Sequence, residues 1–288
     1  MAVNKFSDLT HAEFKALYVG GRRAGKQSKS VKKAAKAAAQ AQAGTSFDAY
    51  IASRGIVTAA SVDWRAAGGV TPVKQQGQCG SCWAFASTVA TEGALFVGSG
   101  KLVPLSEQQI TSCDFNNGDG NAGCNGGIQS VALDWMTKQP GQCSEVTYPY
   151  TSAGGKDGSC IKGCVPVAKF TQSIQVTPRN QTALEEAITA VPLSLSVDAS
   201  GAFWQSYSGG VITKSCKCTS DDCLDHGVGG VGFGTDATTG DDYYIVKNSW
   251  SADWGMKGYI LIGRGSKYGV TGQCGLQIDS TLAVGSAL

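Results

Sequence analysis

The pattern of apolar and polar positions predicts helices in the first part of the compact region of the chain. An apolar run of helical character extends over residues 82–97, and a second helix is expected over residues 126–138. Between them, Ser106 with Gln109 three residues later has the pattern of a capped helix start. This part of the chain is therefore expected to be mostly helical.

The pattern changes in the later part of the chain. Residues 193–198 alternate apolar and polar positions, as a half-buried strand does. One helix is expected before them, with Thr182 as its cap and Glu185 three residues further on. Short apolar runs predict more strands over residues 227–234, 243–247 and 259–263. Helices followed by strands predict an α+β fold, with a cleft where the two parts meet.

The composition describes a compact globular chain with an uneven charge. Of its 288 residues, 42% are hydrophobic and 16% are charged, and no run of about 18 apolar residues predicts a membrane span. Residues 1–57 hold ten Lys or Arg and three Asp or Glu, which is +7, whereas residues 58–288 hold fourteen and nineteen, which is −5. The two parts are therefore expected to serve different purposes.

Residues 20–44 are of low complexity, and seven Lys or Arg without an acid fall within residues 22–36. Binding to nucleic acid or to an anionic membrane is one interpretation of this basic run. A solvated, protease-sensitive linker is the interpretation we favour, because no aromatic residue interleaves the charges. Neither nucleic acid nor a membrane is therefore expected as a partner.

Cys82 is the candidate centre of the chemistry. It stands at the predicted start of a helix, where the positive end of the macrodipole favours thiolate over thiol. Cys79-Gly80-Ser81-Cys82 also reads as a C-x-x-C pair, for which a disulfide or a redox role is the alternative. Eleven cysteines suggest an oxidising compartment with ten paired and one left over, and Cys82 is the best candidate for that one.

A nucleophilic thiolate needs a base, an orienting group for that base and donors for an oxyanion. His226 lies 144 residues after Cys82, and His11 is the chain's other histidine. The side-chain oxygen of Asn248 can accept from one imidazole nitrogen while the other faces the thiolate. Gln76 can offer amide N–H groups beside the backbone N–H of Cys82. Trp250 could shield the imidazole–amide hydrogen bond from water.

These residues stand in motifs that resemble those of papain-like cysteine peptidases, most closely the cathepsin L group. The matching motifs occur in the order of that family and cover roughly residues 60–285: Gln76, Cys79-Gly80-Ser81-Cys82-Trp83, Cys124-Asn125-Gly126-Gly127, Asp225-His226-Gly227 and Asn248-Ser249-Trp250. The cysteine motif is a known signature of the family, so this is a match and not a derivation.

The resemblance implies a two-lobed papain-like fold and a cysteine-type endopeptidase. Its helical lobe would span about residues 75–165 and its barrel-like β-rich lobe about 166–285 together with the N-terminal segment, with the active-site cleft between them. Catalysis would use a triad of Cys82, His226 and Asn248 and an acyl-enzyme intermediate, with Gln76 in the oxyanion hole. No cofactor is implied.

The same resemblance suggests a proenzyme. Asn4-x-Phe6-x-Asp8 and the residues up to Phe14 resemble the end of an inhibitory propeptide, so residues 1–19 are interpreted as its C-terminal remnant. Residues 20–57 would be the basic, Ala-rich linker and maturation region, and residues 58–288 the mature domain. We expect that the start is truncated and that any signal peptide was lost with it. Lysosomal, vacuolar or secreted localisation is expected.

By resemblance, Gly126 and Gly127 form the backbone edge on which an extended substrate lies. Asp279 occupies the floor of the main specificity pocket, which suggests acceptance of Arg or Lys beside bulky apolar groups. The alternative is an exposed carboxylate that points away. Expected partners are protein or peptide substrates, the chain's own propeptide and cystatin-type inhibitors, and a monomer is expected. Other substrate-binding candidates are Ile128, Gln129, Ser196, Leu224, Gly227 and Trp250.

The remaining cysteines allow two interpretations. The resemblance pairs Cys79 with Cys124, Cys113 with Cys160, and Cys216 with Cys274; Cys143–Cys164 and Cys218–Cys223 complete the set as a guess, because spacing alone does not settle connectivity. Alternatively, Cys216, Cys218, Cys223 and His226 have the ligand types of a zinc site. The disulfide interpretation is favoured, because it needs no metal.

Two further alternatives remain at this stage. One is a catalytically silent, disulfide-rich binding or storage protein of the same fold, and the other is an enzyme that transfers the acyl group to an amine.

Overall fold

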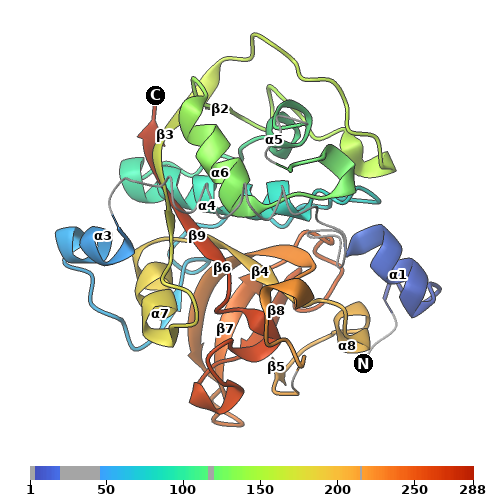
Figure 1. Ribbon diagram of the computed structural model, residues 1–288, viewed down its shortest axis with the longest axis vertical. Coiled ribbons are helices and arrows are strands. Elements are labelled where there is room, and N and C mark those ends of the chain that lie inside the picture. The colour runs from blue at the N-terminus through green and yellow to red at the C-terminus, as the bar shows by residue number, and fades with distance from the viewer. Residues whose placement is uncertain (1–3, 20–45, 116–119, 215) are drawn as a thin grey trace.

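The computed structural model describes residues 4–19, 46–115, 120–214 and 216–288. Within these ranges the chain forms one nine-stranded sheet and a group of helices, with the helices α4, α5 and α6 in the upper part of Figure 1 and most strands in the lower part. This arrangement is the expected α+β class. The helices of the upper part span Cys82–Ser99 (α4), Glu107–Cys113 (α5) and Gln129–Lys138 (α6).

Helix α4 lies at the junction of the helices and the sheet. Every residue from Cys82 to Leu95 is buried, including the polar side chains of Ser87, Thr88, Thr91 and Glu92, so the helix is covered on all sides. The helix contacts α5 and α6 and also strands β4, β6 and β9. It ends where Gly100 adopts the left-handed conformation at φ 70°. Its first residue, Cys82, is therefore held by both parts of the molecule.

The sheet has the strand order β2-β3-β9-β4-β6-β7-β8-β5, and β1 also pairs with β6. All pairings are antiparallel except β5 with β8. The strands span Val62–Asp63 (β1), Gln142–Cys143 (β2), Pro166–Gln175 (β3), Leu193–Val197 (β4), Val211–Ile212 (β5), His226–Thr235 (β6), Asp242–Lys247 (β7), Tyr259–Gly263 (β8) and Ser280–Ala287 (β9).

The register of β6 and β7 places two candidate residues at one end of the sheet. Gly229 pairs with Lys247 in the antiparallel ladder. His226 at the start of β6 and Asn248 directly after β7 are therefore neighbours, although 22 positions separate them. Of the longer strands, β3 and β9 were not among the sequence-based expectations.

Two sequence-based expectations about the strand-rich part of the chain need correction. The polar positions of β4 are buried as well as the apolar ones, because the hydroxyl of Ser194 donates to Thr281 O (2.9 Å) and that of Ser196 to the Asp279 carboxylate (2.8 Å). Helix α7 begins at Gln181 and extends to Ala190, so its cap is Asn180 and not Thr182. The Asn180 side chain accepts from Ala183 N at 3.1 Å.

The N-terminal segment packs on the strand-rich part. Helix α1 (His11–Tyr18) starts with a full capping box between Thr10 and Glu13. The rings of Phe6 and Phe14 are fully buried in the core cluster that also contains Trp250. Residues 4–19 are thus anchored by apolar side chains.

Part of the expected linker is a helix. Helix α3 (Phe47–Arg54) is capped by Ser46 and ends at Gly55, whose φ is 61°. Phe47, Tyr50 and Ile51 are buried in the same core cluster as the N-terminal segment. The basic run at residues 22–36 lies outside the described residues.

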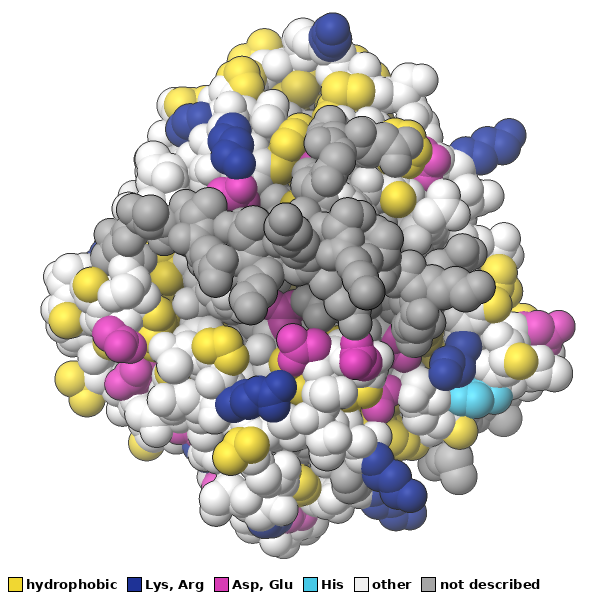
Figure 2. All heavy atoms as spheres, viewed as in Figure 1, with side chains coloured by type: hydrophobic (Ala, Val, Ile, Leu, Met, Phe, Trp, Pro, Cys, Tyr) yellow, Lys and Arg dark blue, Asp and Glu magenta, His cyan; other side chains and the backbone are white. Residues whose placement is uncertain are grey.

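The described charges are mixed on the face seen in Figure 2, where acidic side chains lie near the middle and Lys and Arg side chains are scattered around them. In the described part of the chain, no helix is long and apolar enough to cross a membrane. The remaining helix is α8 (Ala202–Gln205), and short 3-10 turns span Gly123–Asn125, Ser152–Gly154, Asp221–Cys223, Ser266–Tyr268 and Gln273–Gly275.

Candidate active site

Cys82 is the first residue of α4 and is buried. All eleven cysteines lie within the described residues, and Cys82 is the one that belongs to no disulfide. Its sulfur stands at the positive end of an 18-residue helix. The macrodipole and the N–H groups of the first turn stabilise negative charge there, so the position favours a thiolate.

His226 and Asn248 form a hydrogen bond of 2.8 Å between Nε2 and Oδ1. Ser249 N also donates to Asn248 Oδ1 at 2.8 Å, which identifies that atom as the amide oxygen. Nε2 of His226 therefore carries the proton, and Nδ1 of the neutral ring has the lone pair. Nδ1 is buried and has no hydrogen-bond partner among the described residues. It can accept a proton.

The start of β6 lies directly against the start of α4. A Cβ atom at Gly227 would stand 3.0 Å from Cys82 O and 2.8 Å from Gln129 Nε2. Only a residue without a side chain allows this close approach. The residue next to His226 in the chain therefore touches Cys82, so the residues that carry the imidazole and the thiol lie close together.

The surroundings of His226 are apolar. Burial lowers the pKa of His226 to about 4, although the hydrogen bond with Asn248 acts in the opposite direction. The ring of Trp250 stacks on the imidazole at a centroid distance of 4.7 Å, and Phe6 and Phe14 pack edge-on against that indole. In this state the imidazole is neutral at neutral pH.

Gln76 connects the loop before Cys82 with the turn after β7. Its backbone N donates to Ser249 O (2.9 Å), and its Oε1 accepts from the Ser249 hydroxyl (2.6 Å). Its Nε2 donates to Cys79 O at 3.0 Å and has a second N–H to offer. The Gln76 side chain is fully buried beside the loop that precedes Cys82.

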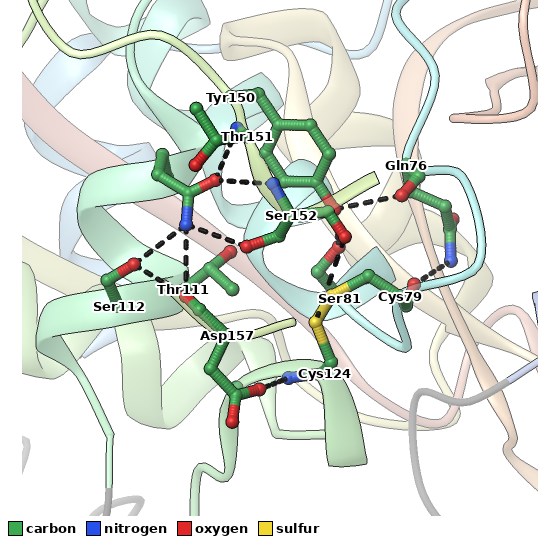
Figure 3. The surroundings of a disulfide bond; sticks show 12 residues. Gln76, Cys79, Ser81, Thr111, Ser112, Cys124, Tyr150, Thr151, Ser152 and Asp157 are labelled. Carbon is green, nitrogen blue, oxygen red and sulfur yellow. Dashed lines mark hydrogen bonds between the residues drawn. A yellow bond between two sulfur atoms is a disulfide. The ribbon is translucent and has the colours of Figure 1, made fainter. Parts of the chain in front are cut away.

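The residues expected to bind substrate fall into two groups. The first group is Gly126 and Gly127, which follow Cys124. Cys124 forms a disulfide with Cys79 in the loop that precedes Cys82. Figure 3 shows this disulfide and its surroundings. Gly127 is closely packed, since a Cβ there would be 2.5 Å from the Trp83 ring.

The second group forms a buried hydrogen-bonded series. Gln129 Nε2 donates to Ser196 Oγ at 3.1 Å, and Ser196 Oγ donates to Asp279 Oδ2 at 2.8 Å. Asp279 is 7% exposed, so its carboxylate does not point into solvent. Leu224 lies in a small apolar cluster with Ile278, and Ile128 is fully buried.

The structure bonds the cysteines in five pairs: Cys79–Cys124, Cys113–Cys160, Cys143–Cys164, Cys216–Cys274 and Cys218–Cys223. Three of the four proposed zinc ligands are thereby in disulfides, and the fourth, His226, bonds to Asn248. Their sulfur atoms are not available to a metal, which removes the zinc hypothesis for this arrangement.

A buried charge cluster next to the site is not apparent from the sequence. Lys74 Nζ lies 2.8 Å from Glu107, 3.4 Å from Glu145 and 3.6 Å from Glu92. Thr71 donates to Glu92 (2.6 Å) and accepts from Lys247 (2.9 Å), which precedes Asn248 in the chain. These residues are distant in sequence, so no local pattern reveals the cluster.

An α+β fold with a helix-terminal thiol beside an imidazole–asparagine pair is the arrangement of a thiol protease. The model of the papain family cysteine proteases matches residues 58–284. Rat procathepsin L is 40% identical over 92% of this chain and 72% of its own length, and the germination-specific cysteine protease 1 of Arabidopsis thaliana is 37% identical over 99% and 70%. The chain belongs to the papain family and is a cysteine endopeptidase.

Solved structures agree with this assignment. The proform of the ragweed pollen allergen Amb a 11 superposes with a TM-score of 0.80 at 35% identity, covering 99% of this chain and 80% of that one. The recombinant stem bromelain precursor gives a TM-score of 0.78 at 32% identity, covering 99% and 82%. Both are precursors, and both extend over residues before the family match. The chain is therefore similar to proenzymes along nearly its full length.

Proposed function

We propose that this chain hydrolyses peptide bonds with Cys82 as nucleophile, His226 as acid and base, and Asn248 as the group that orients the imidazole. The observation that carries the proposal is the 2.8 Å bond from His226 Nε2 to Asn248 Oδ1. It fixes the ring tautomer and leaves Nδ1 as the proton acceptor beside the start of α4.

The proposed reaction has two stages. The thiol proton passes to His226 Nδ1, the thiolate of Cys82 attacks the peptide carbonyl carbon, and the carbonyl oxygen becomes an oxyanion. Cys82 N–H and the second Nε2 proton of Gln76 donate to that oxyanion. His226 then protonates the leaving amine as the C–N bond breaks. Water, deprotonated by His226, attacks the resulting thioester and releases the acid and the thiol.

The proposal includes a propeptide and a mature domain. Residues 1–19 act as the end of an inhibitory propeptide, residues 20–57 as linker and maturation region, and residues 58–288 as the mature domain. The buried contacts of Phe6 and Phe14 with Trp250 support this division, because they place the N-terminal segment next to the site. Cystatin-type inhibitors are the expected protein partners of the monomer.

A lysosomal, vacuolar or extracellular location is proposed, because five disulfides suit an oxidising compartment. For inhibition by small molecules, a relative offers a precedent: the solved structure of the bromelain protease from Ananas comosus, 36% identical to this chain, is a complex with the inhibitor E64.

The preference of the main pocket is proposed to include Arg and Lys, owing to the buried carboxylate of Asp279. Leu-Arg and Arg-Arg dipeptide reporters test this, with the residue preceding the scissile Arg as the variable. Asp279→Ala is expected to reduce cleavage of the Arg-Arg reporter selectively. An unchanged ratio between the two reporters in this variant would refute the assignment.

The two histidines of the chain offer a matched test of the mechanism. His226→Ala is expected to lower kcat/KM by about a thousandfold or more, because base and acid are lost together. His11→Ala changes only the N-terminal segment that is removed, so it controls for folding and processing, and its processed product should have the kcat/KM of the unsubstituted protein. Retained activity in His226→Ala would reject the proposed mechanism.

A further inference from the structure

The hydroxyl of Tyr150 lies between the two ends of the loop that leads to Cys82. It is 2.9 Å from Gln76 O and 2.7 Å from Ser81 Oγ, and Figure 3 shows both contacts. A carbonyl oxygen can only accept, so the Tyr150 proton goes to Gln76. Tyr150 must then accept from the Ser81 hydroxyl. One hydroxyl therefore joins the residue before Cys82 to the backbone of Gln76.

Through this hydrogen bond, Tyr150 in the helix-rich part of the molecule fixes the backbone carbonyl of Gln76. On the other side, Ser249 holds Gln76 with two hydrogen bonds of 2.9 and 2.6 Å. The next residue, Gly77, has a φ of 67° and no room for a side chain, since a Cβ would lie 2.3 Å from Ala153 O. The position of the Gln76 amide thus depends on the Tyr150 and Ser249 contacts together.

Tyr150 is itself firmly placed. Its backbone N donates to Glu145 Oε1 at 3.0 Å, and the other oxygen of Glu145 lies 3.4 Å from Lys74 Nζ. Its ring meets Phe85 edge-on at a centroid distance of 4.9 Å. The backbone and the ring of Tyr150 are thus held by the buried charge cluster and by α4, and together they fix the position of its hydroxyl.

We propose that Tyr150 is a positioning residue, which holds Gln76 and the start of α4 at the separation that an oxyanion between them requires. The proposal rests on the function proposed above, in which Gln76 and the N–H of Cys82 are the oxyanion donors. Donors stabilise a developing charge best when they are already in place, because no reorganisation is then needed during the reaction.

The test replaces Tyr150 by Phe, which removes one oxygen atom and keeps the ring. Removing an oxyanion donor typically costs a hundredfold or more in kcat, and a donor that is only displaced should cost about tenfold. We expect kcat, measured per titrated Cys82, to fall by that factor while KM stays within about twofold. Alkylation of Cys82 by iodoacetamide should keep its rate and pH profile, because it forms no oxyanion.

Tyr148→Phe is the matched control. Tyr148 belongs to the same Tyr-Pro-Tyr sequence and is buried, and its hydroxyl accepts from Ile161 N at 2.8 Å and donates to Ser159 O at 3.2 Å. These contacts lie away from the Cys82 loop. Its kcat is expected to stay unchanged. Equal kcat values in the two variants, or a parallel loss in the alkylation rate of Tyr150→Phe, would overturn the proposal.

Two further measurements keep the outcomes separate. If Tyr150→Phe yields no titratable Cys82, Ser81→Ala decides: a lower kcat with unchanged alkylation supports the proposal, and an unchanged kcat overturns it. The unsubstituted protein tests the underlying function, since a protein that neither titrates nor cleaves peptides fails there. An active protein whose Tyr150→Phe variant behaves like Tyr148→Phe refutes only the positioning role.

Discussion

Replacing Lys74 by Met removes the cation that three acidic side chains share. Its ammonium lies 2.8 Å from Glu107, 3.4 Å from Glu145 and 3.6 Å from Glu92, and it also donates to Leu105 O at 2.9 Å. Glu92 and Glu107 are 3% and 2% exposed. Water therefore cannot replace the missing ammonium for these two carboxylates.

The expected loss of stability is about 3–5 kcal/mol, the usual effect of leaving a buried charge without its partner. The pH dependence of this loss of stability follows from the titration of Glu107. Burial raises the pKa of this carboxyl above the ordinary value of 4.5, and Lys74 counteracts the rise. The substitution raises it further. Because the folded protein then holds a proton that the unfolded chain releases, stability falls as pH rises above about 4.5, and the loss should be larger at high pH.

Urea unfolding at pH 5 and pH 8, followed by tryptophan fluorescence, measures both effects. Cys82→Ala as the common background prevents self-digestion. Lys138→Met is the control, since Lys138 pairs with Asp134 at 2.6 Å but its side chain is 67% exposed. An exposed pair of this kind contributes about 0.5 kcal/mol. Equal losses in the two variants, or a larger loss for Lys74→Met at pH 5 than at pH 8, would refute the reasoning.

Three other substitutions test separate parts of the structure. Burial raises the pKa of Asp225 from 3.8 to about 7, so stability falls as pH rises through that range. In thermal unfolding, Asp225→Asn should be more stable by about 4 kcal/mol at pH 7.5 and nearly equal at pH 4. Phe14→Ala removes a buried ring 5.1 Å from Trp250, so amide exchange in α1 should accelerate while β6 is unaffected. Gly227→Ala places a methyl group 3.0 Å from the backbone of α4 and should lower kcat/KM, whereas Gly154→Ala, which has open space around it, should not.

His226 and Asn248 could be predicted from the sequence for two reasons. The chain has only two histidines, and one of them lies in the basic N-terminal part. Motif order then supplies Asn248, which no spacing rule would single out. The structure explains why these positions work together: the antiparallel β6–β7 ladder brings the start of one strand beside the end of the other.

Other features are beyond local pattern reading. In the sequence, Lys74, Glu92, Glu107 and Glu145 look like ordinary surface residues. Tertiary packing brings them together and buries Glu92 and Glu107. Tyr150 likewise stands in a loop, and its contact with Gln76 joins residues 74 positions apart.

Helix α3 is different, because its signal is present in the sequence. Ser46 before an apolar pattern at Phe47, Tyr50 and Ile51, with Gly55 as the stop, predicts a capped amphipathic helix. The adjoining low-complexity stretch and the charge of the region favour a linker when the segment is considered as a whole. The burial of these three side chains shows that residues 47–54 of this region form a packed helix, which the linker interpretation did not anticipate.

Peptide mapping after titration with an epoxysuccinyl inhibitor tests the central claim most directly. The processed protein is incubated at about pH 5.5, where only an activated thiol reacts readily. We predict one equivalent of label, all of it on Cys82, and none in His226→Ala. A folded, processed protein that takes up no label, or that carries it on another cysteine, would contradict the proposed role of Cys82 and His226.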